Sequence, residues 1–259
     1  MPSHSTLLRY AHLTGLACLG ALLAGWTAAP ASAQTLFRVG VQEIDYFPIY
    51  AATAPDYQFR GYAREVLDLF ARQEDIQLAY VPLPVRRLIR EYRQGRLDLV
   101  LPDNPHWDVA AKAGMNISYS QPLLVFQDAI LVQPQHLGQP LDSFRTLGFI
   151  HGFTPWKLQA DIAAGRVHIK EAPSPESLIR MTLLGYIDGA NMGRQVARYH
   201  LRRLGMPHAL VVEPRLLELK DSYYHLSSNH HPALIARFDA FLLREKTAID
   251  ALLAKYDLQ

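Results

Sequence analysis

Two short segments of the chain combine residue types that are suited to holding a small ligand. One contains Asn104 and Trp107 after the apolar run "LDLVLP", and the other contains Thr154 and Trp156 after the run "LGFI". In both, a proline follows the residue that can cap a helix. Asparagine or threonine at the cap and proline at the first helical position predict that a helix begins at each segment.

Helix starts of this kind can bind polar groups. Their first N–H groups have no partner within the helix, and the helix dipole places a partial positive charge there. Tryptophan adds an apolar wall with one N–H donor. In open parallel sheets, ligands bind beyond the carboxyl ends of the strands. If the two segments belong to two lobes, they would face each other across a cleft. The alternative is an ordinary helix start whose tryptophan packs on its own sheet.

Sequence signals for catalysis are weak. Ser120 and Ser143 are not surrounded by the G-x-S-x-G pattern of a nucleophile elbow. Asp45 and Asp103 could approach each other as an acid and base pair, but no motif supports this. We therefore predict a protein that is not an enzyme, with no catalytic residues.

The histidines do not form a convincing metal site. His230 and His231 are adjacent and precede a proline that starts a helix, so exposed loop positions are expected. His106 and His151 lie near the proposed cleft, where each could either contact a ligand or stay solvated. We predict no metal and no cofactor.

Apolar strands alternate with amphipathic helices along most of the chain, which indicates an α/β fold with parallel strands. In the first half we expect strands at 36–42, 76–83 and 96–102 and helices at 61–75 and 84–95. In the second half we expect strands at 146–150, 167–172 and 186–191 and helices at 155–165, 174–185 and 194–205. The region 232–256 is expected to form a long amphipathic helical segment.

The first 33 residues are typical of a secretory signal peptide. An apolar run follows Arg9 and ends at the small-residue site Ala31-Ser32-Ala33, which predicts cleavage after Ala33 and a periplasmic protein. An uncleaved anchor and lipid attachment at Cys18 are the alternatives. Cys18 is the only cysteine, so the mature chain would have no disulfide and no thiolate site.

Charge and length exclude several classes of protein. The chain has 26 Lys and Arg against 24 Asp and Glu, so it offers no electrostatic footprint for nucleic acid or a membrane surface. The residues after the signal peptide are enough for one large domain or two small lobes.

The order of motifs resembles that of the extracellular solute-binding proteins of family 3, the amino-acid-type binding proteins. The resemblance covers nearly the whole mature chain and rests on "FRVGVQEIDYFPIY", "RGYAREVLDLF", "LIREYRQGRLDLVLP", "ISYSQPLLVFQDAILV", "LGFIHGFTPW" and "LLGYIDGANMGRQVARYHL". It implies a type II periplasmic binding protein fold, with two α/β lobes joined by two crossing strands. On this basis lobe 1 would comprise 34–122 and 222–259, and lobe 2 would comprise 123–221.

The resemblance also implies a ligand site between the lobes. Carried onto this chain, it would draw on Asp45, Tyr46, Phe47, Asp103, Asn104, Trp107, Lys112, Gly152, Phe153, Thr154, Trp156, Asn191 and Met192. Two family features are missing. The arginine that usually pairs with the ligand carboxylate has no counterpart in "NPHWDVAAKAG", where Lys112 is the only cation. The aspartate that usually takes the ammonium is replaced by Asn191 and Gly193.

The sequence therefore predicts a periplasmic binding protein that captures a small polar or amphipathic molecule, amino-acid-like or related, for uptake by an ABC transporter. A periplasmic sensor module is the first alternative, and a cleft enzyme of the cyclohexadienyl dehydratase type is the second. The expected partners are a membrane permease or a sensor kinase, and the protein is expected to be a monomer.

Overall fold

A computed structural model describes residues 34–217 and 221–259. The predicted signal peptide, its cleavage site and Cys18 lie outside the described residues. The segment from Gln34 to Gln259 forms one compact unit. None of the described helices is both long and apolar enough to cross a membrane.

The first group of elements is built on three parallel strands. The central strand, β1 (Leu36–Gln42), pairs with β4 (Gln77–Leu83) on one side and with β5 (Leu99–Asp103) on the other. Two helices connect these strands, α1 (Tyr62–Gln73) and α2 (Val85–Arg93). The remaining elements of this part are β2 (Asp45–Tyr46), β3 (Tyr50–Ala51), α3 (Val109–Lys112) and β6 (Ser118–Tyr119).

The second group repeats the same construction. Strand β8 (Thr146–Ile150) pairs in parallel with β9 (His168–Ala172) and with β10 (Gly189–Gly193). Its helices are α4 (Gln159–Ala163), α5 (Pro175–Leu183) and α6 (Arg194–Arg203). Shorter elements complete it: η1 (Pro134–His136), η2 (Leu141–Ser143), η3 (Trp156–Leu158) and β11 (Val211–Val212).

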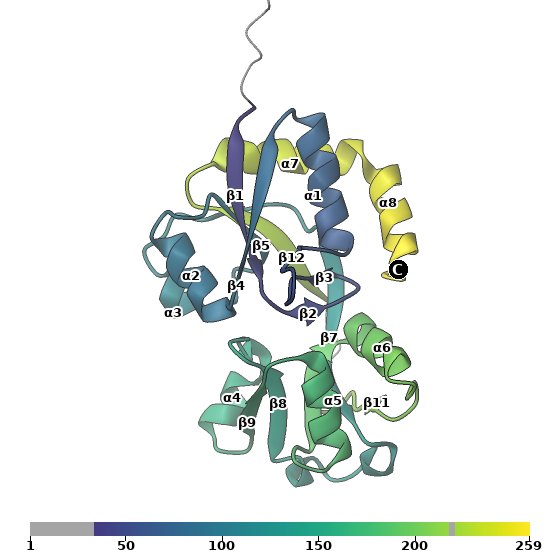
Figure 1. Ribbon diagram of the computed structural model, residues 1–259. Helices are drawn as coiled ribbons and strands as arrows, with labels where there is room; N and C mark the ends of the chain where they lie inside the picture. The colour runs from purple at the N-terminus through teal and green to yellow at the C-terminus, as the bar shows by residue number, and fades with distance from the viewer. Residues whose placement is uncertain (1–33, 218–220) are drawn as a thin grey trace, which may run out of the picture. The chain divides into compact units, whose positions relative to one another are not determined.

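Two long strands join the groups. Strand β7 (Leu124–Val132) leads into the second group and β12 (Asp221–Ser228) returns from it (Figure 1). They pair antiparallel with each other, and the whole sheet has the order β4-β1-β5-β12-β7-β10-β8-β9. The chain ends with α7 (Pro232–Arg244) and α8 (Lys246–Lys255), which pack with the first group. The predicted class, two α/β lobes joined by two crossing strands, is confirmed.

Below, lobe 1 denotes β1–β6, α1–α3, α7 and α8, and lobe 2 denotes β8–β11 and α4–α6. The residue boundaries of the lobes remain a prediction. The largest buried apolar cluster contains side chains of both lobes, such as Leu67 of α1 and Leu178 of α5. In lobe 1, Phe70 of α1 packs against Phe238 and Phe241 of α7. In lobe 2, Leu147 and Phe149 of β8 are buried in a separate cluster.

Three predicted helices differ from the observed ones. The segment 155–165 forms a 3-10 turn followed by the short helix α4, and the helix after Pro105 begins only at Val109. The predicted C-terminal segment divides at Glu245 into α7 and α8. By contrast, Ser174 caps α5 as expected, because its hydroxyl accepts the Ser177 N–H.

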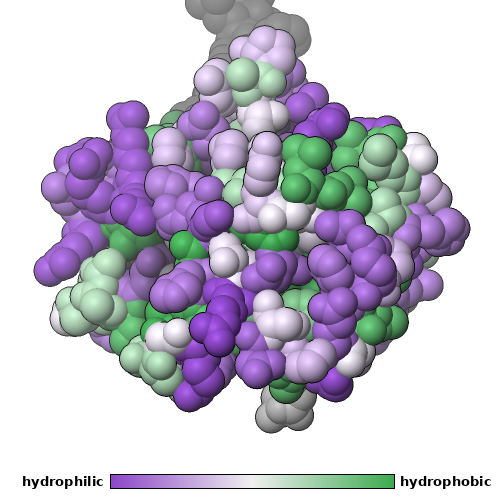
Figure 2. Space-filling view, turned by 90° about the horizontal axis from the view of Figure 1, so that it is seen from below, coloured by the Kyte–Doolittle hydropathy of each residue, from purple (hydrophilic) through white to green (hydrophobic). Residues whose placement is uncertain are grey.

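The end of the molecule formed by lobe 2 has a mixed surface. Figure 2 shows hydrophilic residues over most of this face, with hydrophobic residues in separate patches between them. Leu137, Leu184 and Tyr186 are among the exposed large apolar side chains of the described residues.

Gly61 allows the chain to enter α1. It has a φ of 101°, and the first N–H groups of the helix, those of Tyr62 and Ala63, donate to the carbonyl groups of Pro48 and Ile49. A Cβ on Gly61 would lie 2.9 Å from both of these carbonyl oxygens. Only glycine combines this backbone conformation with so close an approach.

We expect Gly61→Ala to lower the free energy of unfolding by about 3 kcal/mol, since it combines backbone strain with a clash against fixed backbone atoms. The matched control is Gly114→Ala, where φ is 79° but no atom lies within 4 Å of the new Cβ. That variant should lose only about 1 kcal/mol. Urea unfolding of both variants measures the difference, and equal losses would contradict the role given to the two carbonyl groups.

Candidate functional site

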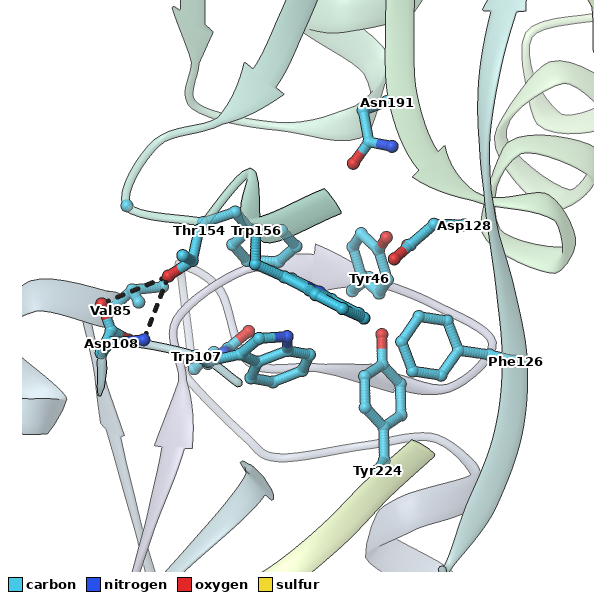
Figure 3. Close-up of a pocket in the computed structure, with 13 residues that line it drawn as sticks. Tyr46, Val85, Trp107, Asp108, Phe126, Asp128, Thr154, Trp156, Asn191 and Tyr224 are labelled. Atoms are coloured by element: carbon cyan, nitrogen blue, oxygen red, sulfur yellow. Dashed lines mark hydrogen bonds between the residues drawn. The ribbon is translucent and has the colours of Figure 1, made fainter. Parts of the chain in front are cut away.

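A pocket lies where the two lobes and the two crossing strands meet (Figure 3). Its lining comprises Gln42, Tyr46, Val85, Trp107, Asp108, Phe126, Asp128, Gly152, Phe153, Thr154, Trp156, Asn191 and Tyr224. The cavity volume is about 40 Å³, which is room for roughly three water molecules. The site is therefore narrow as the lobes stand in this structure.

The crossing strands supply one wall of the pocket. Phe126 and Asp128 are two residues apart on β7, so they point to the same face of the strand. Tyr224 lies on β12 and stacks on Phe126 with ring centroids 4.0 Å apart. Trp107 meets the edge of the same tyrosine at 5.6 Å. Both lobes are thus in contact with the wall that the connecting strands β7 and β12 form.

The turn after β8 supplies the facing wall. Gly152 has a φ of 84°, and a Cβ there would lie 3.0 Å from Cβ of Val85 in lobe 1. Thr154 was predicted to cap a helix, but its hydroxyl serves lobe 1 instead. It accepts the Asp108 N–H at 3.3 Å and donates to the Asp108 carboxylate at 3.4 Å (Figure 3). Since Thr154 reaches across the pocket, the following turn has no side-chain cap.

Further contacts between the lobes close the site. The Gly193 N–H in lobe 2 donates to the Tyr46 hydroxyl in lobe 1 at 2.9 Å. The rings of Tyr46 and Phe153 are 5.5 Å apart. Outside the pocket, Arg86 of lobe 1 approaches Glu171 of lobe 2 at 3.4 Å. The arrangement is that of two lobes closed on each other.

Asp128 is the most perturbed acid of the pocket. Burial raises its pKa to about 6, and the ammonium group of Lys157, 3.8 Å from the carboxylate, offsets part of that rise. Lys157 also lies 5.3 Å from the ring centre of Trp156. It lines an adjoining hollow that shares Asp128, Thr154, Trp156 and Asn191 with the pocket.

Asp108 is the second acid of the lining. Burial raises its pKa, and the more distant Lys112 opposes this effect together with the hydrogen bond from Thr154. Its backbone adopts a φ of 50°, which asparagine and aspartate tolerate better than most residues. The pocket therefore holds two partly desolvated carboxyl groups, one from each side.

Seven of the residues predicted from the sequence line this pocket. They are Tyr46, Trp107, Gly152, Phe153, Thr154, Trp156 and Asn191. The two tryptophan segments do face one cavity, but the helix starts expected there are short turns. Their role as ligand residues stays a prediction.

Three other predicted residues form a buried polar cluster beside the pocket. The ammonium group of Lys112 bonds to the Asp103 carboxylate and to the Asn104 carbonyl. Asp103 also accepts the Ser227 hydroxyl at 2.6 Å, and the Asn104 amide donates to the Tyr223 carbonyl at 2.8 Å. Each of the three side chains is thus engaged within the protein and lies outside the lining.

The remaining three predicted residues lie elsewhere. Asp45 pairs with Arg203 of α6 at 2.9 Å, and Phe47 packs against Tyr199 with ring centroids 4.6 Å apart. Met192 is buried in the core. Because Asp45 and Asp103 have separate cationic partners, the structure gives no support to a catalytic carboxylate pair.

Sequence reasoning missed six residues of the lining: Gln42, Val85, Asp108, Phe126, Asp128 and Tyr224. The sequence did contain a pattern that points to three of these residues. The crossing strands "LVFQDAILV" and "DSYYHLSS" place every second side chain on one face, and that face meets the cleft at Phe126, Asp128 and Tyr224. Asp108 gave no comparable signal, since its position depends on the left-handed turn before α3.

The histidines occupy structural positions. His106 stacks on Trp156 at 4.8 Å outside the lining, and His151 approaches Glu171 at 2.7 Å. His231 contacts Asp98 at 3.3 Å. Within residues 34–217 and 221–259, no group of three potential ligands is placed to hold a metal ion.

Comparison with solved structures identifies the architecture. A histidine kinase sensor domain with similarity to periplasmic binding proteins has a TM-score of 0.69, with 19% identity over 86% of this chain and 96% of that one. The substrate-binding protein of an amino acid ABC transporter has a TM-score of 0.68, with 14% identity over 86% of this chain and 100% of that one. The fold is that of a type II periplasmic binding protein.

A third structure of this fold is an ancestral amino acid-binding protein, AncCDT-1, described as a precursor of cyclohexadienyl dehydratase. Its TM-score is 0.67, with 17% identity over 86% of this chain and 96% of that one. No family model and no curated protein matches the chain. The resemblance to family 3 solute-binding proteins is confirmed at the level of the type II fold.

We expect Asp103→Asn to lower the free energy of unfolding by about 3–5 kcal/mol, because it leaves the buried charge of Lys112 without its partner. The two side chains are only 2% and 6% exposed. In the exposed pair Lys246–Asp250, Asp250→Asn should cost less than about 1 kcal/mol. Denaturant unfolding of both variants measures the contrast. A mild effect of Asp103→Asn would show that the pair is not structural.

The raised pKa of Asp128 predicts an unusual dependence of stability on pH. Between about pH 4 and pH 6 the folded protein holds a proton on Asp128 that the unfolded chain has lost, so this residue lowers stability as pH rises. The difference in unfolding free energy between the ligand-free wild type and Asp128→Asn should therefore fall, on the order of 2 kcal/mol, from pH 4 to pH 7. Other carboxylates cancel in the difference. A constant difference would contradict the raised pKa.

Proposed function

We propose that the chain is a periplasmic solute-binding module that captures a small polar or amphipathic molecule between its lobes. One observation carries the proposal: a single pocket is lined by side chains of both lobes and of the strands that join them. A molecule bound there would contact both lobes at once. It would therefore favour the closed arrangement over an open one, by the difference in its affinity for the two.

The module serves uptake through an ABC transporter, with delivery of ligand to a membrane permease. This choice is supported by the fold that the chain shares with the substrate-binding protein of an amino acid transporter. The signal peptide proposed for residues 1–33, with cleavage after Ala33, would bring the protein to the periplasm. We propose that it works there as a monomer.

A sensory role is the second candidate, because the same fold occurs in a histidine kinase sensor domain. In that case a sensor kinase, rather than a permease, would recognise the closed lobes. The two roles share the pocket and its ligand. They differ in the protein that recognises the closed form.

An enzymatic role has less support. Among the described residues that line the pocket, Asp108 bonds to the Thr154 hydroxyl, but no Ser, Cys, His or Lys side chain accompanies the two carboxyl groups. The ancestral neighbour described as a precursor of cyclohexadienyl dehydratase is itself named an amino acid-binding protein. Recovery of an unchanged ligand from the complex would support binding, whereas a converted product would support catalysis.

The two tryptophans of residues 34–259, Trp107 and Trp156, both line the pocket, so tryptophan fluorescence reports directly on the site. We expect a saturable change in emission when unfolded and refolded protein of residues 34–259 meets its ligand from a small-molecule panel. The melting temperature should rise with it, since a ligand at a hundred times its Kd adds about 2.7 kcal/mol.

Matched variants assign the response to the pocket. Thr154→Val removes the hydroxyl that reaches Asp108 and should weaken binding, while Thr182→Val, a buried hydroxyl that bonds to Leu178 within α5, should leave the Kd unchanged. Both remove a hydrogen-bonded threonine hydroxyl, half-buried at Thr154 and fully buried at Thr182, so the control should lose at least as much stability. If no compound of a broad panel changes fluorescence or melting temperature, the proposed function fails.

A further inference from the structure

Aromatic side chains surround the pocket. Its lining includes six of them, from both lobes and from both crossing strands: Tyr46, Trp107, Phe126, Phe153, Trp156 and Tyr224. The labelled members gather around one space in Figure 3. The face of an aromatic ring carries partial negative charge, and it attracts a cation within about 6 Å of the ring centre. Several rings around one small space are therefore suited to a positively charged group.

The charged groups of the lining have one sign. Asp108 and Asp128 are acidic, and none of the described lining residues carries a lysine or arginine side chain. Lys157 meets Asp128 from the adjoining hollow. Asp108 forms no ion pair within the described residues, and its carboxylate is held by the Thr154 hydroxyl. Two desolvated carboxyl groups in one pocket repel anions and stabilise a cation between them.

The cations that a ligand carboxylate would need are used elsewhere. Lys112 is buried against Asp103, and Arg86 points to Glu171. A free amino acid would have to place its carboxylate near Asp108 or Asp128, without a basic side chain in the lining to offset the repulsion. The pocket therefore discriminates against ligands that carry a carboxylate.

We propose that the pocket binds a compact organic cation, an alkylammonium or quaternary ammonium group without a carboxylate. This inference rests on the proposed binding function and names the class of its ligand. The ammonium group would lie among the aromatic faces, between Asp108 on the lobe 1 side and Asp128 on the lobe 2 side. The cavity volume of about 40 Å³ restricts the enclosed part of the ligand to a small head group.

Three probes of nearly equal size separate charge from shape. Choline is the cation, 3,3-dimethylbutan-1-ol is its neutral counterpart with carbon in place of nitrogen, and glycine betaine adds a carboxylate. Methylammonium offers a smaller head group, and tetramethylammonium keeps the head group of choline without its hydroxyethyl arm. Each is titrated into refolded protein of residues 34–259, with tryptophan fluorescence and calorimetry as readouts. We expect at least one of the cations to bind, and the neutral and zwitterionic probes to bind at least tenfold more weakly.

Variants test the assigned groups. Asp108→Asn and Asp128→Asn should each weaken the binding of the cation at least tenfold, because each removes one of the two charges that face it. Asp142→Asn, an exposed acid of lobe 2, is the matched control and should leave the Kd unchanged. Melting temperatures of the ligand-free variants confirm that each is folded.

The outcomes separate this inference from the proposed function. If amino acids such as glycine or glutamine bind and the three cations do not, the binding function stands and the cation inference is overturned. Equal affinity for choline and its neutral counterpart also overturns the inference, because the pocket would then recognise apolar shape alone. If neither the cations nor a broad panel binds, the proposed function fails together with it.

Discussion

The antiparallel pairing of β7 with β12 is the constraint on which the rest of the structure depends. Tyr224 pairs with Leu124 and Ser222 with Phe126, so the register of these two strands fixes which side chains point into the cleft. A shift of β12 by one residue would turn Tyr224 away from the face that carries Phe126 and Asp128. The connection between the lobes and one wall of the pocket are therefore the same piece of structure.

Polar contacts outside the pocket also hold the lobes together. Arg203 of α6 bridges Asp45 of lobe 1 and Glu176 of its own lobe, and His200 lies 3.1 Å from the Asp45 carbonyl. Near the C-terminus, Arg198 of α6 contacts Asp257 at 2.9 Å. The Arg198, Arg203 and Asp257 side chains are exposed, so their ion pairs contribute only a little, whereas the His200 side chain is buried. A molecule bound in the pocket would add to these contacts and shift the population further toward the closed arrangement.

Regular elements of this fold could be read from the sequence because their signals are local. The strand 146–150 coincides with β8, and the helix capped by Ser174 forms as α5. At Trp107 the Asn104 side chain accepts the His106 N–H as a cap would, but the left-handed Asp108 (φ 50°) ends the turn before a helix forms. At Trp156 no cap forms, because the Thr154 hydroxyl bonds to Asp108 instead. Local propensity does not reveal such a competition, which exists only when both lobes are in place.

Charged residues were the least predictable part of the site for the same reason. Asp103 and Lys112 have the residue types of ligand anchors, yet they are nine residues apart across a turn that brings them together, and each satisfies the other in the core. Asp128 lies in a strand that the sequence identifies only as a crossing segment. Its raised pKa comes from burial among rings supplied by β2, β12 and the turn after β8. A carboxylate is stable there only when a positive charge approaches it. Lys157 meets that need from one side, and the carboxylate also lines the pocket, so under the proposed binding function a cationic ligand would approach it from the other side.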